Sequence, residues 1–216
     1  MKLAYETLTI GAMANNIYFL YDQESLDCVI IDPGFLPEKQ LDLIRERGWK
    51  LRQIWVTHGH FDHVAGVKTI SEAFDPPIPI AMSLESFDWA KQNPSSAVYG
   101  GRVDEVPRVD IPLVHGNWIG LTTTAEKKVV EVRDVSGHNP GSLLFYCPEL
   151  KIAFVGDAIF KESIGRTDFP GSEHELLLKN IREQVYTLPE DTFLLPGHMD
   201  LTTVGHEKRY NPFVRS

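Results

Sequence analysis

The sequence predicts an α+β fold in which two β-sheets pack face to face and helices cover both outer faces, a four-layer αββα sandwich. Two observations predict it. Each half of the chain contains strand-like apolar runs followed by a helical pattern and a further strand, and the two halves do not repeat one another. The 216 residues suit one domain, residues 1–216, and are enough to bury a sizeable core.

The first third of the chain is expected to contain four strands and one helix. Three strand-like runs come first, and they cover residues 3–10, 16–21 and 28–31. Residues 22–25 form a turn signal, so the second and third runs are expected to make a hairpin. Pro37 opens a helix at a position where proline is tolerated, and Gly48 closes it. A strand at residues 54–56 follows.

The middle of the chain is less regular. Residues 75–79 contain three prolines and therefore exclude a helix before a short strand at 80–82. Ser83 is suited to cap a helix that ends near Gln92. Residues 93–112 are rich in Pro, Gly, Ser and charge, and we interpret them as a long surface loop. This loop either borders an active site or is a mobile connection.

The last third returns to strands and helices. Strands are expected at residues 128–135, 142–146, 152–155 and 193–195. Ser172 and Glu175 have the spacing of a capping box, and the apolar residues after them keep helical spacing as far as Leu188. A short final helix is expected from Gly205 to Tyr210.

Composition narrows the classes of partner. The formal net charge is −9, and no Lys/Arg run is present, so binding to nucleic acid or to an anionic membrane is not expected. Cys28 and Cys147 lie far apart in apolar runs, and we expect buried thiols. The N-terminus lacks the apolar segment of a signal peptide, and no run reaches the roughly 20 apolar residues of a membrane span. The expected location is the cytoplasm.

A dense cluster of metal-binding side chains follows the strand at 54–56. His58, His60, Asp62 and His63 lie within six positions. Imidazole and carboxylate groups are ligands that zinc, iron and manganese accept. Side chains of one regular strand alternate between its faces, so the chain must turn sharply for these four to converge. Gly59 is expected to permit the backbone angles of that turn. A solvated polar loop is the alternative, and the density of the cluster disfavours it.

Three later sites share one local pattern, in which an apolar strand is followed by glycine and a residue able to bind metal. They are Gly137-His138, Gly156-Asp157 and Gly197-His198. Glycine lets the backbone bend, so that the next side chain leaves the strand end toward a common centre. The four strand-end sites together predict a metal centre.

These motifs resemble the metallo-β-lactamase fold superfamily over nearly the whole chain. Residues 165–171 and 196–212 resemble its glyoxalase II-like (hydroxyacylglutathione hydrolase-like) branch. The resemblance implies two adjacent divalent metal ions. Zinc is the expected metal, and iron and manganese are the alternatives. The implied ligands are His58, His60 and His138 for the first ion, Asp62, His63 and His198 for the second, and Asp157 between both.

The resemblance also implies a reaction. A metal-bound hydroxide would attack the acyl carbon of a small anionic thioester, such as S-lactoylglutathione, with Asp62 and Asp157 as the catalytic carboxylates. Asp62 has a second possible role, orienting the nucleophile. Asp32 is expected to hydrogen-bond a ligand histidine, or else only to end its strand. Arg166 is expected either to contact substrate or to pair with Asp168.

Two departures from the branch leave the substrate open. The chain stops soon after Pro212, so the C-terminal helical region that grips glutathione in full-length relatives is not expected. Asn139 and Met199 stand where relatives usually have threonine and glycine. The rival hypothesis is a mononuclear iron persulfide dioxygenase-like oxidoreductase, and a third is a catalytically silent metal-binding module. We expect a monomer or a small homo-oligomer.

The other polar and aromatic residues are expected to have ordinary roles. We assign His115 and His174 to the surface and His206 to the cap of the last helix. Trp89, Tyr99 and Arg102 are expected either to line the pocket or to have ordinary packing roles.

Overall fold

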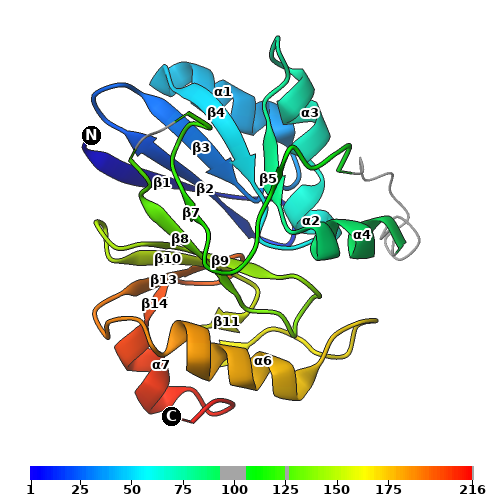
Figure 1. The fold of residues 1–216 in the computed structure, drawn as a ribbon, viewed down its shortest axis with the longest axis vertical. Coiled ribbons are helices and arrows are strands. Elements are labelled where there is room, and N and C mark those ends of the chain that lie inside the picture. Colours follow the sequence, from blue (N-terminus) through cyan, green and yellow to red (C-terminus); the bar gives the residue numbers. More distant parts are fainter. Residues whose placement is uncertain (93–105, 125–126, 216) are drawn as a thin grey trace.

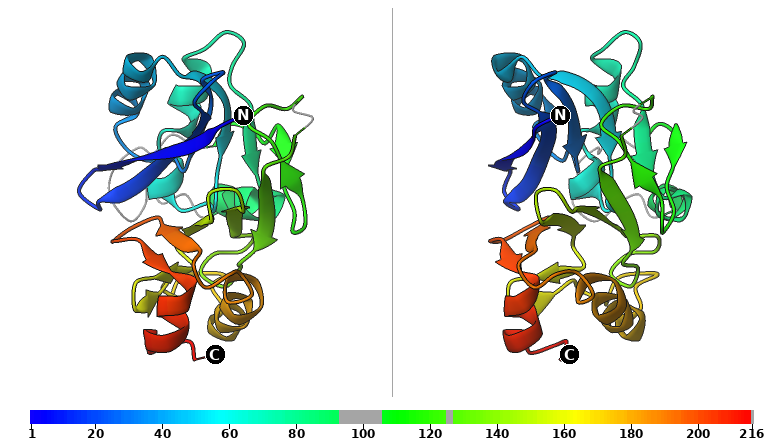
Figure 2. Two further views of the ribbon diagram at one scale, coloured as in Figure 1. Left: turned by 90° about the vertical axis from the view of Figure 1, so that its left-hand side faces the viewer. Right: turned by 60° about the vertical axis from the view of Figure 1, so that its left-hand side comes forward.

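Two six-stranded sheets face each other with helices on both outer sides, which confirms the expected αββα sandwich (Figure 1). The structure is a computed structural model, and it describes residues 1–92, 106–124 and 127–215. Helices α1 and α3 cover the first sheet, and α6 and α7 cover the second (Figure 1). From two further sides, Figure 2 shows α1 and α7 at opposite ends of the molecule.

The first sheet is built from the N-terminal half. Its strands, in spatial order, are β1 (Leu3–Ile10), β2 (Asn15–Asp22), β3 (Asp27–Ile31), β4 (Lys50–Trp55), β5 (Ile80–Met82) and β6 (Ile111–Pro112). The helices of this half are α1 (Pro37–Arg47), α2 (Phe61–Val64), α3 (Val67–Glu72) and α4 (Leu84–Gln92). As predicted, Pro37 lies in the first turn of α1, and Gly48 ends it with a left-handed φ of 66°.

One expectation for this half is wrong. Strand β6 lies inside the segment 93–112, which we interpreted as a loop, and it pairs in parallel with β5. A strand of two residues is too short to give an alternating pattern in the sequence. Its extended conformation depends on pairing with the neighbouring strand. Residues 93–105, which include Tyr99 and Arg102, lie outside the described part of the chain.

The second sheet is built from the C-terminal half. Its strands, in spatial order, are β14 (Thr202–Thr203), β13 (Phe193–Pro196), β10 (Ile152–Gly156), β9 (Leu143–Cys147), β8 (Val130–Asp134) and β7 (Trp118–Ile119). Strands β11 (Ile159–Phe160) and β12 (Ser163–Ile164) form a separate hairpin. The helices are α6 (His174–Asn180), which continues as a π-helix at Ile181–Val185, and α7 (Val204–Tyr210).

Both helices of this half begin differently from the prediction. The expected capping box is absent: Glu173 is the N-cap of α6 without a side-chain bond, and the Ser172 hydroxyl donates to the His138 carbonyl at 2.7 Å. Helix α7 is capped by Thr203, whose hydroxyl accepts the His206 N–H at 3.2 Å. The capping role assigned to His206 therefore belongs to Thr203.

The space between the sheets is filled by apolar side chains from both halves. Trp55 and Phe145 meet there with ring centres 5.4 Å apart, and neither is exposed. Cys28 and Cys147 are free and buried, as expected. Burial of this apolar surface is the main force that holds the two sheets together. No helix in the described ranges is long and apolar enough to cross a membrane.

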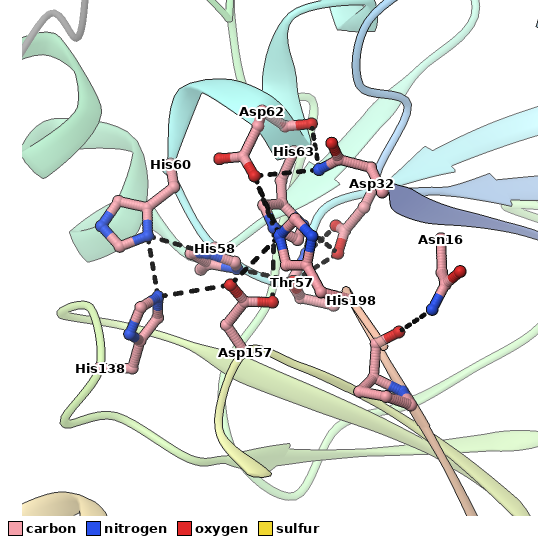
Figure 3. A network of polar contacts seen from close by, with 12 residues as sticks. Asn16, Asp32, Thr57, His58, His60, Asp62, His63, His138, Asp157 and His198 are labelled. Carbon is pink, nitrogen blue, oxygen red and sulfur yellow. Dashed lines mark hydrogen bonds and ion pairs between the residues drawn. The ribbon is translucent and has the colours of Figure 1, made fainter. Parts of the chain in front are cut away.

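Strand directions bring distant segments to one edge of the sandwich. β3 and β4 are parallel, and so are β10 and β13, so each pair ends on a common side of its sheet. β8 runs the same way as β10, because both are antiparallel to β9. The loops after these strands carry polar side chains, and they meet at this edge (Figure 3).

Candidate metal centre

Three histidines form the first group of donors at this edge. The Nδ1 atom of His60 lies 3.1 Å from Nε2 of His58 and 2.9 Å from Nε2 of His138. His58 and His138 are buried, and the three ring nitrogens face one another (Figure 3). These three atoms can hold one metal ion, because all lie within 4.8 Å of one another.

A carboxylate and two histidines form the second group. Oδ2 of Asp62 lies 3.0 Å from Nε2 of His198 and 3.6 Å from Nε2 of His63. These three residues also offer donor atoms within 4.8 Å of one another. A further arrangement, made of Asp32, His58 and His63, meets the same criterion. Asp32, however, already accepts hydrogen bonds from the Thr57 N–H, the Thr57 hydroxyl and the His63 ring.

Asp157 lies between the two groups. Its Oδ2 atom is 3.8 Å from Nε2 of His138 and 3.6 Å from Nε2 of His198. Its Oδ1 atom is 3.5 Å from Nε2 of His63. The carboxylate therefore approaches one histidine of the first group and two of the second (Figure 3).

The glycines next to these residues act for two different reasons. Gly156 adopts a left-handed φ of 52° directly before Asp157, which matches the expected backbone bend. Gly59 is not in that region, so the expectation for it is wrong. A Cβ atom at Gly59 would instead lie 2.6 Å from the Ser86 carbonyl oxygen of α4. Gly59 is required by the close approach of this helix.

Hydrogen bonds hold the histidines from behind. The Nδ1–H of His63 donates to Oδ2 of Asp32 at 3.0 Å, and Asp32 also accepts the Thr57 N–H at 2.7 Å. His138 donates its Nδ1–H to the Arg166 carbonyl at 2.8 Å, and His198 donates to the Met13 carbonyl at 3.0 Å. Each of the three bonds from a histidine Nδ1 fixes a tautomer in which Nε2 is free to bind metal.

Three residues that support the site were missed by the sequence reasoning. Asn15 donates its amide to Oδ2 of Asp62 at 2.9 Å and to the Asp62 carbonyl at 3.1 Å. Asn16 donates to the Pro196 carbonyl at 3.1 Å and so ties β2 to the end of β13. The third is Thr57. Nothing in the sequence singles out the two asparagines, because their partners lie 47 and 180 positions away.

The two unusual residues beside the ligand histidines have different environments. Asn139 is buried, and its side-chain oxygen accepts the Ser86 hydroxyl at 2.9 Å and the Gly59 N–H at 3.3 Å. It therefore connects the loop that carries His60 to α4. Met199 is 59% exposed and has a left-handed φ of 67°.

Electrostatics differ between the two groups. Burial lowers the pKa of His58 well below its usual value, and burial with the neighbouring His138 lowers the pKa of His60 to about 3. Burial also opposes the charged form of His63, but the carboxylates of Asp157 and Asp62 outweigh it and raise its pKa. The first group is therefore neutral near pH 7 and ready to bind metal, whereas His63 holds a proton that a metal would replace.

Two buried polar atoms at the centre test whether a metal fits. Nε2 of His63 and Oδ1 of Asp157 have no hydrogen-bond partner among the described residues. Their separation of 3.5 Å is too long for a strong hydrogen bond. Leaving two such groups unsatisfied in a buried site is costly, and a divalent cation between them would satisfy both. The donor set therefore fits a metal centre.

Aromatic and charged residues border the centre beside His60. The ring of Trp89 lies 5.0 Å from that of His60, and the ring of Phe169 lies 5.2 Å from it. Arg166 forms two hydrogen bonds with Asp168, at 2.9 and 2.8 Å, and its guanidinium lies 4.3 Å from the Phe169 ring centre. The expected pairing with Asp168 is present. His115 and His174 are exposed, as predicted.

A family profile, a relative of known sequence and two solved structures all match nearly the whole chain. The profile of the metallo-beta-lactamase superfamily matches residues 10–198. The hydroxyacylglutathione hydrolase GloC of Haemophilus influenzae is 30% identical over 218 residues, covering 98% of each chain. Two crystal structures are similar in fold. One is the B3 metallo-beta-lactamase BLEG-1, with a TM-score of 0.89, 31% identity and coverage of 99% of this chain and 100% of that one. The other is TTHA1623 in a di-iron-bound form, with a TM-score of 0.85, 32% identity and coverage of 97% and 100%.

Proposed function

The chain belongs to the metallo-beta-lactamase superfamily, and within it we propose that the protein hydrolyses a small acyl thioester with two divalent metal ions. A metal-binding hydrolase is the general class that family and donor set support. The thioester, the number of ions and their identity are the specific parts of the proposal.

One observation carries the two-metal proposal: the Asp157 carboxylate approaches His138 of the first group and His63 and His198 of the second. In this proposal His58, His60 and His138 hold one ion. Asp62, His63 and His198 hold the other, and Asp157 is shared. Five neutral and two anionic ligands leave room for water and substrate. The di-iron form of TTHA1623 supports a two-metal site and makes iron a candidate beside zinc and manganese.

The chain's own side chains would prepare this site for hydrolysis. When bound, the two ions would polarise the acyl oxygen of the substrate and lower the pKa of a water molecule. Asn15 holds the carboxylate of Asp62, so this oxygen donor keeps one orientation. Neither cysteine is available as a nucleophile, because both are buried in the core. A water molecule is therefore the proposed nucleophile, and Asp62 is proposed to orient it.

An anionic thioester is the proposed substrate. The relative from Haemophilus influenzae is named for hydrolysis of hydroxyacylglutathione, which makes S-lactoylglutathione the first candidate. Arg166 is exposed, and its segment holds His138 through the carbonyl, so its guanidinium is proposed to attract the anionic carrier. We propose a cytoplasmic monomer or small homo-oligomer that acts on a small molecule and binds neither nucleic acid nor membrane.

The rival hypothesis is the mononuclear iron persulfide dioxygenase-like oxidoreductase. A single iron would need only part of the donor set. The complete second group, with Asp62 and His198 both present, and the position of Asp157 between the two groups favour the hydrolase.

The test combines metal analysis of the purified chain with three assays. We expect about two metal ions per chain, hydrolysis of S-lactoylglutathione or another small acyl thioester, and much slower turnover of a β-lactam. One iron per chain with oxygen consumption on glutathione persulfide would overturn the hydrolase. Faster turnover of the β-lactam than of any thioester would overturn the proposed substrate class.

A further inference from the structure

The side chain of Thr57, two residues after the end of β4, lies between Asp32 and His58. It is 1% exposed. Its Oγ1 atom donates to Oδ2 of Asp32 at 2.6 Å and lies 3.0 Å from Nδ1 of His58. A hydroxyl group has one hydrogen, and a carboxylate oxygen accepts. The hydrogen of Thr57 therefore goes to Asp32, and the contact with His58 requires that His58 donates its Nδ1–H.

The same oxygen atom of Asp32 also orients His63. Oδ2 accepts the Nδ1–H of His63 at 3.0 Å. Each ring is thus protonated at Nδ1 and turns Nε2 toward the centre. Nε2 of His58 faces Nδ1 of His60 at 3.1 Å, whereas Nε2 of His63 faces Asp62 and Asp157 (Figure 3). One carboxylate oxygen therefore controls one histidine in each group of donors.

We propose that Thr57 is a positioning residue that fixes the tautomer and ring orientation of His58. Through the Asp32 oxygen, it links His58 to His63 and so couples the two metal positions. The coupling rests on the proposed two-metal function, whereas the effect on the His58 ring does not.

Main-chain hydrogen bonds hold Thr57 from both sheets. Its N–H donates to Asp32 at 2.7 Å, and its carbonyl accepts the N–H of Leu143 in the second sheet at 2.8 Å. A Cβ atom at Gly156 would lie 2.6 Å from the Thr57 hydroxyl, so this glycine allows the close packing. Both sheets therefore hold the Thr57 backbone in place, where its hydroxyl reaches Asp32.

Two substitutions separate the hydroxyl from the shape of the side chain. Thr57→Ser keeps the hydroxyl and loses a methyl group. Thr57→Val keeps the branched shape, removes one donor from Asp32 and leaves the buried Nδ1–H of His58 without an acceptor. Removing a hydrogen-bond partner of a metal ligand commonly weakens metal affinity about 10- to 100-fold.

The experiment uses the full zinc-loaded chain and its two variants. Long-range ¹H–¹⁵N spectra report which ring nitrogen of each histidine carries the proton, and competition with a chelator reports zinc affinity. In the wild type we expect His58 and His63 to be protonated at Nδ1. Thr57→Val should lose the slowly exchanging His58 Nδ1 proton, keep that of His63, and bind zinc about 10- to 100-fold more weakly. Thr57→Ser should restore the proton and stay within about threefold of the wild type.

The wild-type spectrum can overturn the proposal even if the valine variant does not fold. A wild-type His58 that carries its proton on Nε2 would overturn it. So would a Thr57→Val protein whose His58 proton and zinc affinity match the wild type. The number of zinc ions per wild-type chain is measured in the same sample. A value of one would remove the two-metal function and the coupling, but the position of the His58 proton would still test the role of Thr57.

Discussion

A Cβ atom added to Gly197 would lie 2.4 Å from Oδ1 of Asp157, which is closer than two such atoms can approach. It would also lie 2.4 Å from Cε1 of His63. Gly197 is not one of the described glycines that adopt a left-handed φ, so its role is steric and not conformational. The backbone before His198 passes so close to the other donors that only glycine fits there.

Gly197→Ala should therefore disrupt the metal centre. The added methyl group must displace Asp157 or His63, and we expect the metal content of the purified chain to fall well below that of the wild type. Gly48→Ala is the matched control, because a Cβ there meets nothing within 4 Å. Its left-handed φ of 66° should cost about 1–2 kcal/mol of unfolding free energy without affecting metal content. A Gly197→Ala protein with full metal content would contradict the close packing described here.

Asp157→Ala should remove metal and activity together. The carboxylate approaches both groups of donors, so its loss should lower the metal content and reduce turnover by about 100- to 1,000-fold. Asp191→Ala is the control, since Asp191 is an exposed carboxylate paired with Lys151. Metal analysis and the thioester assay are run on both variants. If Asp157→Ala retained full activity, the shared role of Asp157 would be wrong.

Metal binding should release protons and strengthen as the pH rises. Burial opposes protonation of His198, but its bond to Asp62 and the charge of Asp157 raise its pKa, and the pKa of His63 is raised as well. Above pH 6.5 both rings of the metal-free chain therefore still hold protons that the metal must displace. His58 and His60 contribute none in this range, because their pKa values are lowered.

Calorimetry of zinc binding in two buffers of different ionisation enthalpy measures this release. We expect proton release near pH 7, an apparent affinity that increases with pH, and a plateau once the pH passes the raised pKa values. An affinity that does not change between pH 6.5 and 8 would show that neither ring is protonated in the metal-free chain.

Arg166→Ala should raise KM for an anionic thioester and leave kcat nearly unchanged. A lost charge-assisted contact corresponds to about a tenfold increase in KM. His138 should remain in place, because its partner is the main-chain carbonyl of residue 166. Arg45→Ala is the control, since Arg45 is exposed on α1 and pairs with Asp42. An unchanged KM would leave Arg166 with only its pairing to Asp168.

Local sequence patterns were sufficient for most of the strands and helices. Apolar runs, the proline that opens α1 and the glycine that ends it act within a few residues, so their effects can be predicted from the chain alone. The density of histidines at residues 58–63 and the repeated strand–glycine–ligand pattern likewise indicated a metal centre. We expected them to converge because a glycine precedes the ligand at each strand end, whereas the strand directions that bring the two sheets' ligands to one edge are seen only in the structure.

Contacts between distant segments decided the rest. Strand β6 exists because β5 lies beside it, and the Ser172 hydroxyl bonds to the His138 carbonyl instead of capping α6. Asn15 holds Asp62 across 47 positions, and Gly59 is required by a helix that packs on it. No local propensity encodes these contacts, because the free energy of each depends on a partner that reaches its place only when the two sheets pack together.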